Sequence, residues 1–128
     1  MQRFTDLKVW QRSHALVLWV YRLTTDFPVE ERFGLVAQLR RAALSVPTNI
    51  AEGSKRQTSQ EYGRFLNIAE VSLAELESLL LVSRDLAYAA VPAVESLLGE
   101  ADEIARMLHA LRTKVVQGSR KAGGTGST

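Results

Sequence analysis

A stripe of polar side chains between residues 38 and 52 is the part of this sequence best suited to chemistry. Pro47 lies within it and removes one backbone hydrogen bond from a segment of helical periodicity, which predicts a kink. The polar residues recur at helical spacing: Gln38, Arg41, Ser45, Thr48, Asn49 and Glu52. Such groups can form a hydrogen-bonded seam that fixes the register of two helices, or they can line a groove that binds a ligand. The residues alone leave both interpretations open.

The partners of this stripe are expected on the helix that follows it. If residues 31–53 and the next helix form an antiparallel hairpin turning near residues 54–57, facing positions have numbers that sum to about 111. This register places Arg41 near three polar residues of the second helix: Glu70, Ser72 and Glu75. We expect Asn49 and Glu52 to be hydrogen-bonded inside the protein. The predicted polar seam consists of Gln38, Ser45, Asn49, Glu52, Ser72 and Glu75.

Basic residues surround the predicted turn and are candidates for binding nucleic-acid phosphates. They are Arg40, Arg41, Lys55, Arg56 and Arg64, of which Arg41 is the one expected to be paired with an internal acid. Residues 1–64 carry 10 Lys/Arg against 6 Asp/Glu, whereas residues 65–116 carry 4 against 8. This unequal distribution is compatible with nucleic-acid binding by the first half, or with pairing of the two halves within or between chains.

Signatures of enzymes and of metal sites are absent from the sequence. His14 is preceded three positions earlier by Gln11, and His109 by Arg106. Neither histidine therefore forms the Glu-x-x-His pair of di-iron bundles. There is no cysteine, no phosphate-binding loop and no nucleophile elbow. We therefore predict no catalytic residues, no metal, no cofactor and no enzymatic activity, and we interpret His14 as a residue at the edge of the core.

The elements that position these residues are predicted to be four helices. Apolar residues recur at helical spacing over about 5–25, 31–53, 58–88 and 92–117, and no segment alternates long enough to be a strand. Asp6 is a candidate N-cap, and Thr58 with Glu61 forms a candidate capping box. Short connections force neighbouring helices to be antiparallel. The prediction is an all-α, up-and-down four-helix bundle over residues 1–117, followed by a flexible tail over 118–128.

The first helix has more apolar surface than one core can cover. One stripe contains Val9, Leu16 and Val20, while a second contains Trp10 and Tyr21, and Leu18 and Trp19 lie on the side expected to face water. A helix with so wide an apolar arc indicates an additional contact surface. The sequence therefore predicts a homo-oligomer, with Trp10 and Trp19 as candidate interface residues.

The overall composition of the 128-residue chain is that of a single globular domain. It has a net charge of +2 and 46% hydrophobic residues. No run of about 18 uncharged apolar residues is present, so no membrane span and no membrane partner are predicted. The first residues, MQRFTDLKVW, contain Asp6 and Lys8 where a signal peptide would be apolar, and we expect a cytoplasmic protein.

Three segments resemble a known family of four-helix-bundle proteins, first noticed as reading frames in intervening sequences of bacterial 23S rRNA genes. They are FTDLKVW at 4–10, FPVEERFGLVAQLRRAALSVPTNIAEG at 27–53 and EYGRFLNIAEVSLAELESLL at 61–80, and the likeness extends over about residues 4–115. Val71 departs from the family pattern, which commonly has a small residue such as Gly at that position. The family name reflects gene location and does not imply a ribosomal protein.

The resemblance implies a ring of five subunits without established enzymatic activity. It also implies kinship with the accessory variability determinants of diversity-generating retroelements, pentameric bundles with basic surfaces that bind nucleic acid and a reverse transcriptase. Two functional hypotheses follow: an oligomer that binds RNA or DNA through basic residues, and a structural scaffold that docks a protein partner. Six cations distinguish these hypotheses: Arg12, Arg22, Arg40, Lys55, Arg56 and Arg64. Their convergence on one face would favour nucleic-acid binding, whereas pairing of each with an acid would favour the scaffold.

Overall fold

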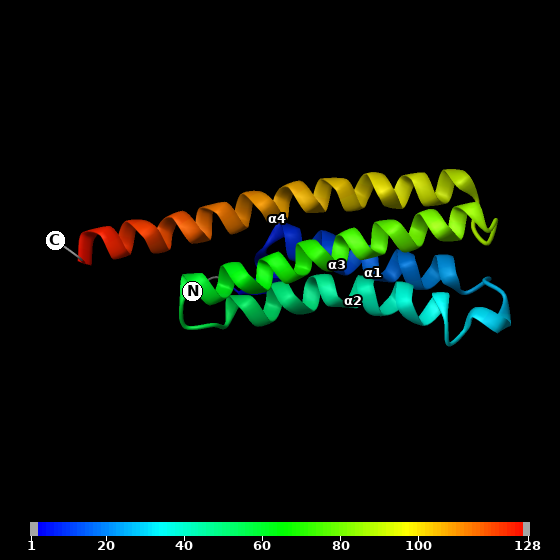
Figure 1. The fold of residues 1–128 in the computed structure, drawn as a ribbon, viewed down its shortest axis with the longest axis horizontal. Coiled ribbons are helices and arrows are strands. Elements are labelled where there is room, and N and C mark those ends of the chain that lie inside the picture. The colour runs from blue at the N-terminus through cyan, green and yellow to red at the C-terminus, as the bar shows by residue number, and fades with distance from the viewer. Residues whose placement is uncertain (1–2, 127–128) are drawn as a thin grey trace.

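The computed structural model describes the backbone of residues 3–126 and the side chains of residues 3–118. Four α-helices follow two short 3-10 segments in the order η1 (Phe4–Asp6), α1 (Lys8–Thr24), η2 (Val29–Glu31), α2 (Leu35–Ser54), α3 (Ser59–Asp85) and α4 (Val91–Gly126). No strand is present in this part of the chain. Figure 1 shows the helices running side by side along the long axis of the molecule.

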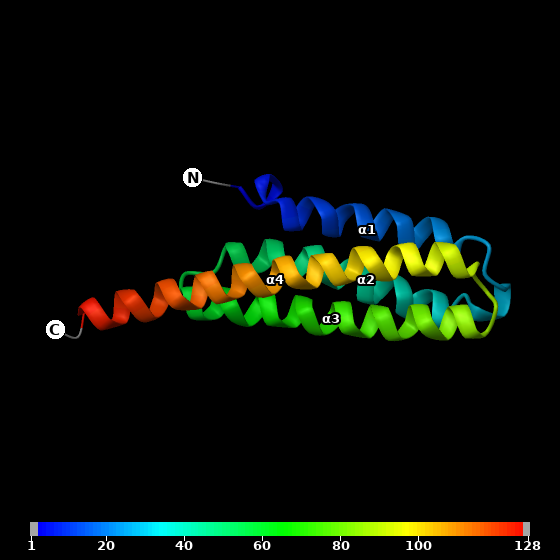
Figure 2. The same cartoon turned by 90° about the horizontal axis from the view of Figure 1, so that it is seen from above.

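The helices run alternately up and down, as the short connections predict. Each helix packs on its neighbours in the sequence, and α1 also contacts α4, so that the four helices enclose one core. Figure 2 shows α1 along one edge of the molecule, with α2, α3 and α4 beside one another. The predicted all-α four-helix bundle is confirmed.

The core is built from the apolar stripe of each helix. In α1 this stripe contains Val9, Leu16 and Val20, which are buried, so the stripe of Trp10 and Tyr21 is left for the periphery. The fully buried large side chains of the other helices are Leu39, Val46, Ile50, Leu66, Leu73, Leu76, Leu80, Val94, Ile104 and Leu108. Their spacing of three and four residues places them on one face of each helix.

The N-terminal boundaries of the first two helices differ from the prediction. Residues 4–6 form the 3-10 helix η1, and α1 begins at Lys8 with Leu7 as N-cap, so Asp6 does not cap it. Residues 31–34, predicted to open the second helix, belong to η2 and to a turn that ends at Gly34, where φ is −104° and ψ is −107°. From Leu35 onward α2 continues as one helix through Pro47, which is buried.

The turn between α2 and α3 is short and tightly packed. The Thr58 hydroxyl accepts a hydrogen bond from the Glu61 backbone N–H at 3.1 Å, which is one of the two bonds of the predicted capping box. Gly53, in the last turn of α2, lies against α3 so closely that a Cβ atom there would be 2.8 Å from Cβ of Phe65 and 3.0 Å from Cδ1 of Tyr62. The absence of a side chain at residue 53 therefore allows the close approach of the two helices.

The connection between α3 and α4 begins three residues earlier than the sequence predicts. Helix α3 ends at Asp85, and Ala87 has a φ of +60°. The N–H of Tyr88 donates to the carbonyl of Ser83 at 3.0 Å, and the N–H of Ala87 donates to the carbonyl of Arg84 at 2.9 Å. These two bonds form a Schellman motif, which satisfies carbonyls at the helix end. The Tyr88 ring then packs against Phe27, with a centroid distance of 5.7 Å.

Helix α4 extends beyond the boundary predicted at residue 117. Its backbone remains helical to Gly126, and Figures 1 and 2 both show its end projecting past the other helices. Residues 127–128 and the side chains from residue 119 onward lie outside the described part of the chain. The predicted flexibility of residues 118–128 stays a prediction. Within the described residues, no helix combines the length and apolar character that crossing a bilayer requires.

Candidate functional site

The centre of the predicted polar seam is a set of hydrogen bonds between α2 and α3. The hydroxyls of Ser45 and Ser72 share a hydrogen bond of 2.7 Å. The side-chain amide of Asn49 donates to the carbonyl of Ser45 at 2.7 Å and to its hydroxyl at 2.9 Å. Ser72 is buried, whereas Ser45 and Asn49 are half-buried. In the described residues no buried side-chain nitrogen or oxygen lacks a hydrogen-bond partner.

The seam continues toward solvent through Arg41. Its guanidinium forms an ion pair with Glu75 of α3 and donates a hydrogen bond of 3.1 Å to Oε1 of Gln38. Of the three residues expected near Arg41, Glu75 is its partner, whereas Glu70 pairs with Arg112 of α4. The predicted sum of about 111, which sets Arg41 directly opposite residue 70, is therefore displaced by about a turn and a half. Arg41 is paired with an acid as expected, and Gln38 completes the contact.

Glu52 lies outside the seam, contrary to expectation. Its side chain is exposed, and within the described residues its carboxylate has no hydrogen-bond partner. It borders cavities on the outer side of α2 together with Phe4 and Ala51. The polar residues of α2 therefore do not all face α3, because the side chain of Glu52 lies on the side of the helix toward α1.

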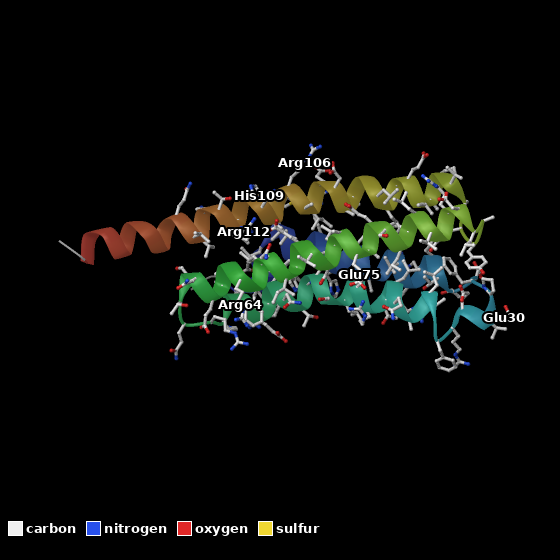
Figure 3. The ribbon with its side chains drawn as sticks, viewed as in Figure 1. Glu30, Arg64, Glu75, Arg106, His109 and Arg112 are labelled. Carbon is white, nitrogen blue, oxygen red and sulfur yellow. The ribbon has the colours of Figure 1, made fainter. Side chains whose placement is uncertain are left out.

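A second polar cluster, which was not predicted from the sequence, joins α3 to α4. Nε of Arg112 donates to Oε1 of Glu70 at 2.5 Å, and Nδ1 of His109 lies 3.9 Å from Oε2 of the same carboxylate. Figure 3 shows Arg112 and His109 neighbouring one another on α4, whereas Arg106 on the same helix points away from the bundle. The i, i+3 spacing of 109 and 112 was a usable signal, but their partner depends on the register of α3 and α4.

Arg12 joins α1 to α4 through two carboxylates. Its Nε and Nη2 atoms donate to Glu100 at 2.8 Å each, and Nη2 also donates to Glu103 at 3.1 Å. The bidentate bond to Glu100 and the bond to Glu103 raise the pKa of the Arg12 guanidinium, and the bond from Arg12 lowers the pKa of Glu103. Elsewhere, burial raises the pKa values of Tyr62 and Glu77, the latter also through the charge of Asp102.

The candidate phosphate-binding cations differ in how they are held. Arg40 donates to the Thr24 hydroxyl at 2.9 Å and lies 4.4 Å from the centroid of the Tyr21 ring. Arg56 lies 4.4 Å from the centroid of Phe65. Within the described residues, no ion pair with a carboxylate is formed by Arg40, Lys55, Arg56 or Arg64.

The six cations that distinguish the two functional hypotheses differ in their surroundings: some are paired with acids, some lie over aromatic rings, and some lie near the α2–α3 turn. Arg12 is paired with acids, and Arg22, like Arg40 and Arg56, lies over an aromatic ring, here that of Trp19 at 5.1 Å. Lys55, Arg56 and Arg64 remain together near the α2–α3 turn, and Figure 3 shows Arg64 at this end of the bundle. We call these three residues the basic end.

A largely apolar groove lies between α1 and α2, and we call it the α1–α2 groove. Its volume is about 530 Å³. Trp10 stacks on His14 in its wall, with ring centroids 4.9 Å apart, and packs edge-on against Phe4 at 5.4 Å. The remaining lining residues are Val17, Leu18, Tyr21, Leu44, Pro47, Thr48, Ala51 and Glu52. The second apolar stripe of α1 thus faces a groove that this chain leaves open.

A second groove of about 560 Å³ lies on the other side of α1, against α4. Trp19, whose side chain is 54% exposed, forms one wall together with Arg22, and Glu100 and Leu97 of α4 line the opposite side. The two candidate interface residues, Trp10 and Trp19, thus lie in different grooves that flank the same helix. In the described part of the chain, His, Asp and Glu side chains do not gather in the groups of three that a metal site needs.

The comparisons with known proteins agree with this architecture. No curated protein matches the chain. Among solved structures, the chain is similar to a protein of unknown function from the S23 ribosomal protein family of Bacteroides thetaiotaomicron VPI-5482, with a TM-score of 0.74, 22% identity, and coverage of 81% of this chain and 97% of that chain. At this identity the likeness shows the fold alone. A family model described as 23S rRNA-intervening sequence protein matches residues 5–110. As its resemblance predicted, the chain belongs to the 23S rRNA-intervening sequence protein family.

Proposed function

We propose that this protein is a non-enzymatic, self-assembling scaffold and that helix α1 provides its assembly surface. The observation that carries this proposal is the pair of grooves on either side of α1. Leu18 is 47% exposed, Trp19 54% and Leu44 42%, so α1 and its neighbour present apolar side chains to solvent over two adjoining surfaces. Apolar surfaces of this kind, rich in aromatic residues, are typical of protein interfaces. A ring of five subunits is the assembly that the resemblance implies.

The mass of the protein in solution tests this proposal. Sedimentation velocity at micromolar concentration is expected to show an oligomer. Trp19→Glu is expected to lower the mass while leaving the helical circular dichroism unchanged, because the new charge would be buried at the contact without a partner. Val71→Glu is the matched control, since Val71 is 62% exposed on α3, away from both grooves. A monodisperse wild-type monomer would overturn the proposal.

A second function, the binding of nucleic acid, is favoured by the basic end. Lys55, Arg56 and Arg64 carry no carboxylate partner in the described residues, whereas Arg12, Arg41 and Arg112 do. A ring would repeat this cationic surface in every subunit, so that contacts too weak in one chain act together. Binding through phosphates would be largely independent of nucleotide sequence and would weaken steeply with added salt.

The triple variant Lys55→Gln, Arg56→Gln, Arg64→Gln tests this second function. Fluorescence anisotropy with a labelled DNA duplex is expected to give a shallower dependence of log K on log salt for the variant than for the wild type. Arg106→Gln is the control, because Arg106 is an exposed cation already paired with Asp102 on its own helix. Full affinity in the triple variant, or no binding by the wild type at low salt, would count against the basic end.

A further inference from the structure

The loop between α1 and α2 presents an apolar tip at one end of the bundle. Phe33 is 88% exposed and Val29 is 74% exposed, the highest values among the large apolar side chains that the structure describes. We call residues 29–33 the tip. Side chains exposed to this degree bury little apolar surface on folding, so the tip has apolar surface available for a contact outside the chain.

The backbone of the tip is held in place before any partner arrives. The N–H groups of Glu31, Arg32 and Gly34 donate to the carbonyls of Pro28, Val29 and Glu31 at 2.9, 3.1 and 3.1 Å. The Arg32 guanidinium also lies 5.5 Å from the centroid of the Phe33 ring. A tip with this internal hydrogen bonding loses little conformational entropy on binding.

The α1–α2 groove offers this tip an apolar surface with cations at one end. It is apolar, with Leu18 and Leu44 exposed along its walls and Trp10 stacked in its side. Where α2 ends, the groove adjoins a smaller cavity of about 360 Å³, and we call this junction the mouth. Its lining residues are Phe4, Ala51, Glu52, Lys55 and Arg56.

The charges of the tip and of the mouth are opposite in pattern. The tip carries two carboxylates and one guanidinium, on Glu30, Glu31 and Arg32, so its balance is −1. The mouth carries one carboxylate and two cations, on Glu52, Lys55 and Arg56, so its balance is +1. Opposite patterns of this kind fix the orientation of two surfaces and accelerate their encounter.

We infer that the tip of one copy of this protein docks in the α1–α2 groove of a second copy. This inference rests on the proposed self-assembly and specifies the contact made at the α1–α2 groove, which does not include Trp19. The tip lies at the end of the bundle opposite the mouth, as the labelled positions of Glu30 and Arg64 in Figure 3 indicate, so each chain offers one tip and one groove at separate places. A contact between two different surfaces is heterologous and propagates head to tail, closing into a ring when the rotation permits.

The joint can be tested with two complementary variants. Phe33→Glu disables the tip, and Leu44→Glu disables the groove, with Leu18→Glu as a second groove variant if Leu44→Glu loses helical circular dichroism. Leu86→Glu and Val71→Glu are the matched controls, because these side chains are 50% and 62% exposed and lie outside both surfaces. Each disabling variant is expected to weaken self-association at least about a hundredfold, since it buries an unpaired charge, and each control is expected to keep the wild-type mass.

Mixing the two disabled variants gives the decisive measurement. The intact groove of Phe33→Glu and the intact tip of Leu44→Glu still fit one another, so an equimolar mixture is expected to form a heterodimer at least about a hundredfold more tightly than either variant associates with itself. No heterodimer in the mixture, or a wild-type mass for Phe33→Glu, would overturn the tip-in-groove joint while leaving self-assembly standing. A monomeric wild type would instead overturn the proposed self-assembly itself.

Discussion

The hydroxyls of Ser45 on α2 and Ser72 on α3 lie 2.7 Å apart in the interface of the two helices, where Ser72 is buried and Ser45 half-buried. Each hydroxyl can satisfy the other, and Asn49 donates to Ser45 from one turn further along α2. Because an unpaired polar group in such a place costs free energy, these three side chains restrict how α2 and α3 can slide relative to one another.

Replacing Asn49 by Leu is expected to lower the free energy of unfolding by about 1–3 kcal/mol, because the carbonyl and hydroxyl of Ser45 lose a donor. Urea denaturation followed by circular dichroism measures the change. Glu52→Leu is the control on the same helix: its carboxylate is exposed and unbound within the described residues, so its effect is expected to remain within about 0.5 kcal/mol. Equal losses in both variants would contradict this account of the seam.

Gly53→Ala is expected to destabilise the protein by about 1–3 kcal/mol, because the added methyl group would overlap Phe65 of α3 and force α2 and α3 apart. Gly99→Ala provides the opposite case in α4. No atom lies within 4 Å of the position of its added Cβ, so this change is expected to stabilise the helix by up to about 1 kcal/mol. Thermal unfolding of the two variants should therefore give midpoint shifts of opposite sign.

Ala87→Gly is expected to stabilise the protein by about 0.5–1 kcal/mol, because Ala87 has a φ of +60° at the end of α3, where glycine has no steric penalty. Ala89→Gly is the control, since Ala89 lies in the same connection without a positive φ. There the added chain flexibility should cost stability and not raise it. Chemical denaturation measures both changes, and a loss of stability in Ala87→Gly would be contrary to the observed helix cap.

The ion pairs of Arg12 predict a dependence of stability on pH. The hydrogen bond from Arg12 lowers the pKa of Glu103 in the folded protein below its unfolded value. The stabilisation is therefore fully present above the unfolded pKa and is lost as the pH falls through the folded pKa. Glu103→Gln should reduce the thermal midpoint at pH 7 and have a diminishing effect below about pH 4.5.

The four helices could be predicted from the sequence because their apolar spacing is strong and regular, as in the run of Leu66, Leu73, Leu76 and Leu80. The register between α2 and α3 could not be predicted in this way. The hairpin sum treats two helices as straight and parallel, whereas the structure sets Ser45 opposite Ser72 and brings Gly53 against Phe65. Register depends on such three-dimensional contacts, which are absent from the periodicity of either helix.

The candidate site was predicted only in part, because periodicity shows which face of a helix is buried but not which residues of other helices meet it. Ser45 and Asn49 were recognised because short polar side chains on a buried helix face need partners. Glu52 was misassigned because a stripe at helical spacing drifts around the helix and residue 52 turns toward α1. The contact of Glu70 with Arg112 was missed because the connection through Ala87 sets the position of α4. The tip was missed because residues 31–34 were expected to be helical.

The two grooves beside α1 also bear on how the protein moves. A helix bordered by open surface on both sides is attached to the remaining three helices along a narrow strip, and its 17 residues make it the shortest α-helix in the described part of the chain. Local opening requires least free energy where few apolar contacts must break. Backbone amides of α1 should then exchange with deuterium before those of α2 and α3, and the exchange should slow as protein concentration rises and a second molecule covers the grooves. The stability of α1 against local opening would thus increase with protein concentration.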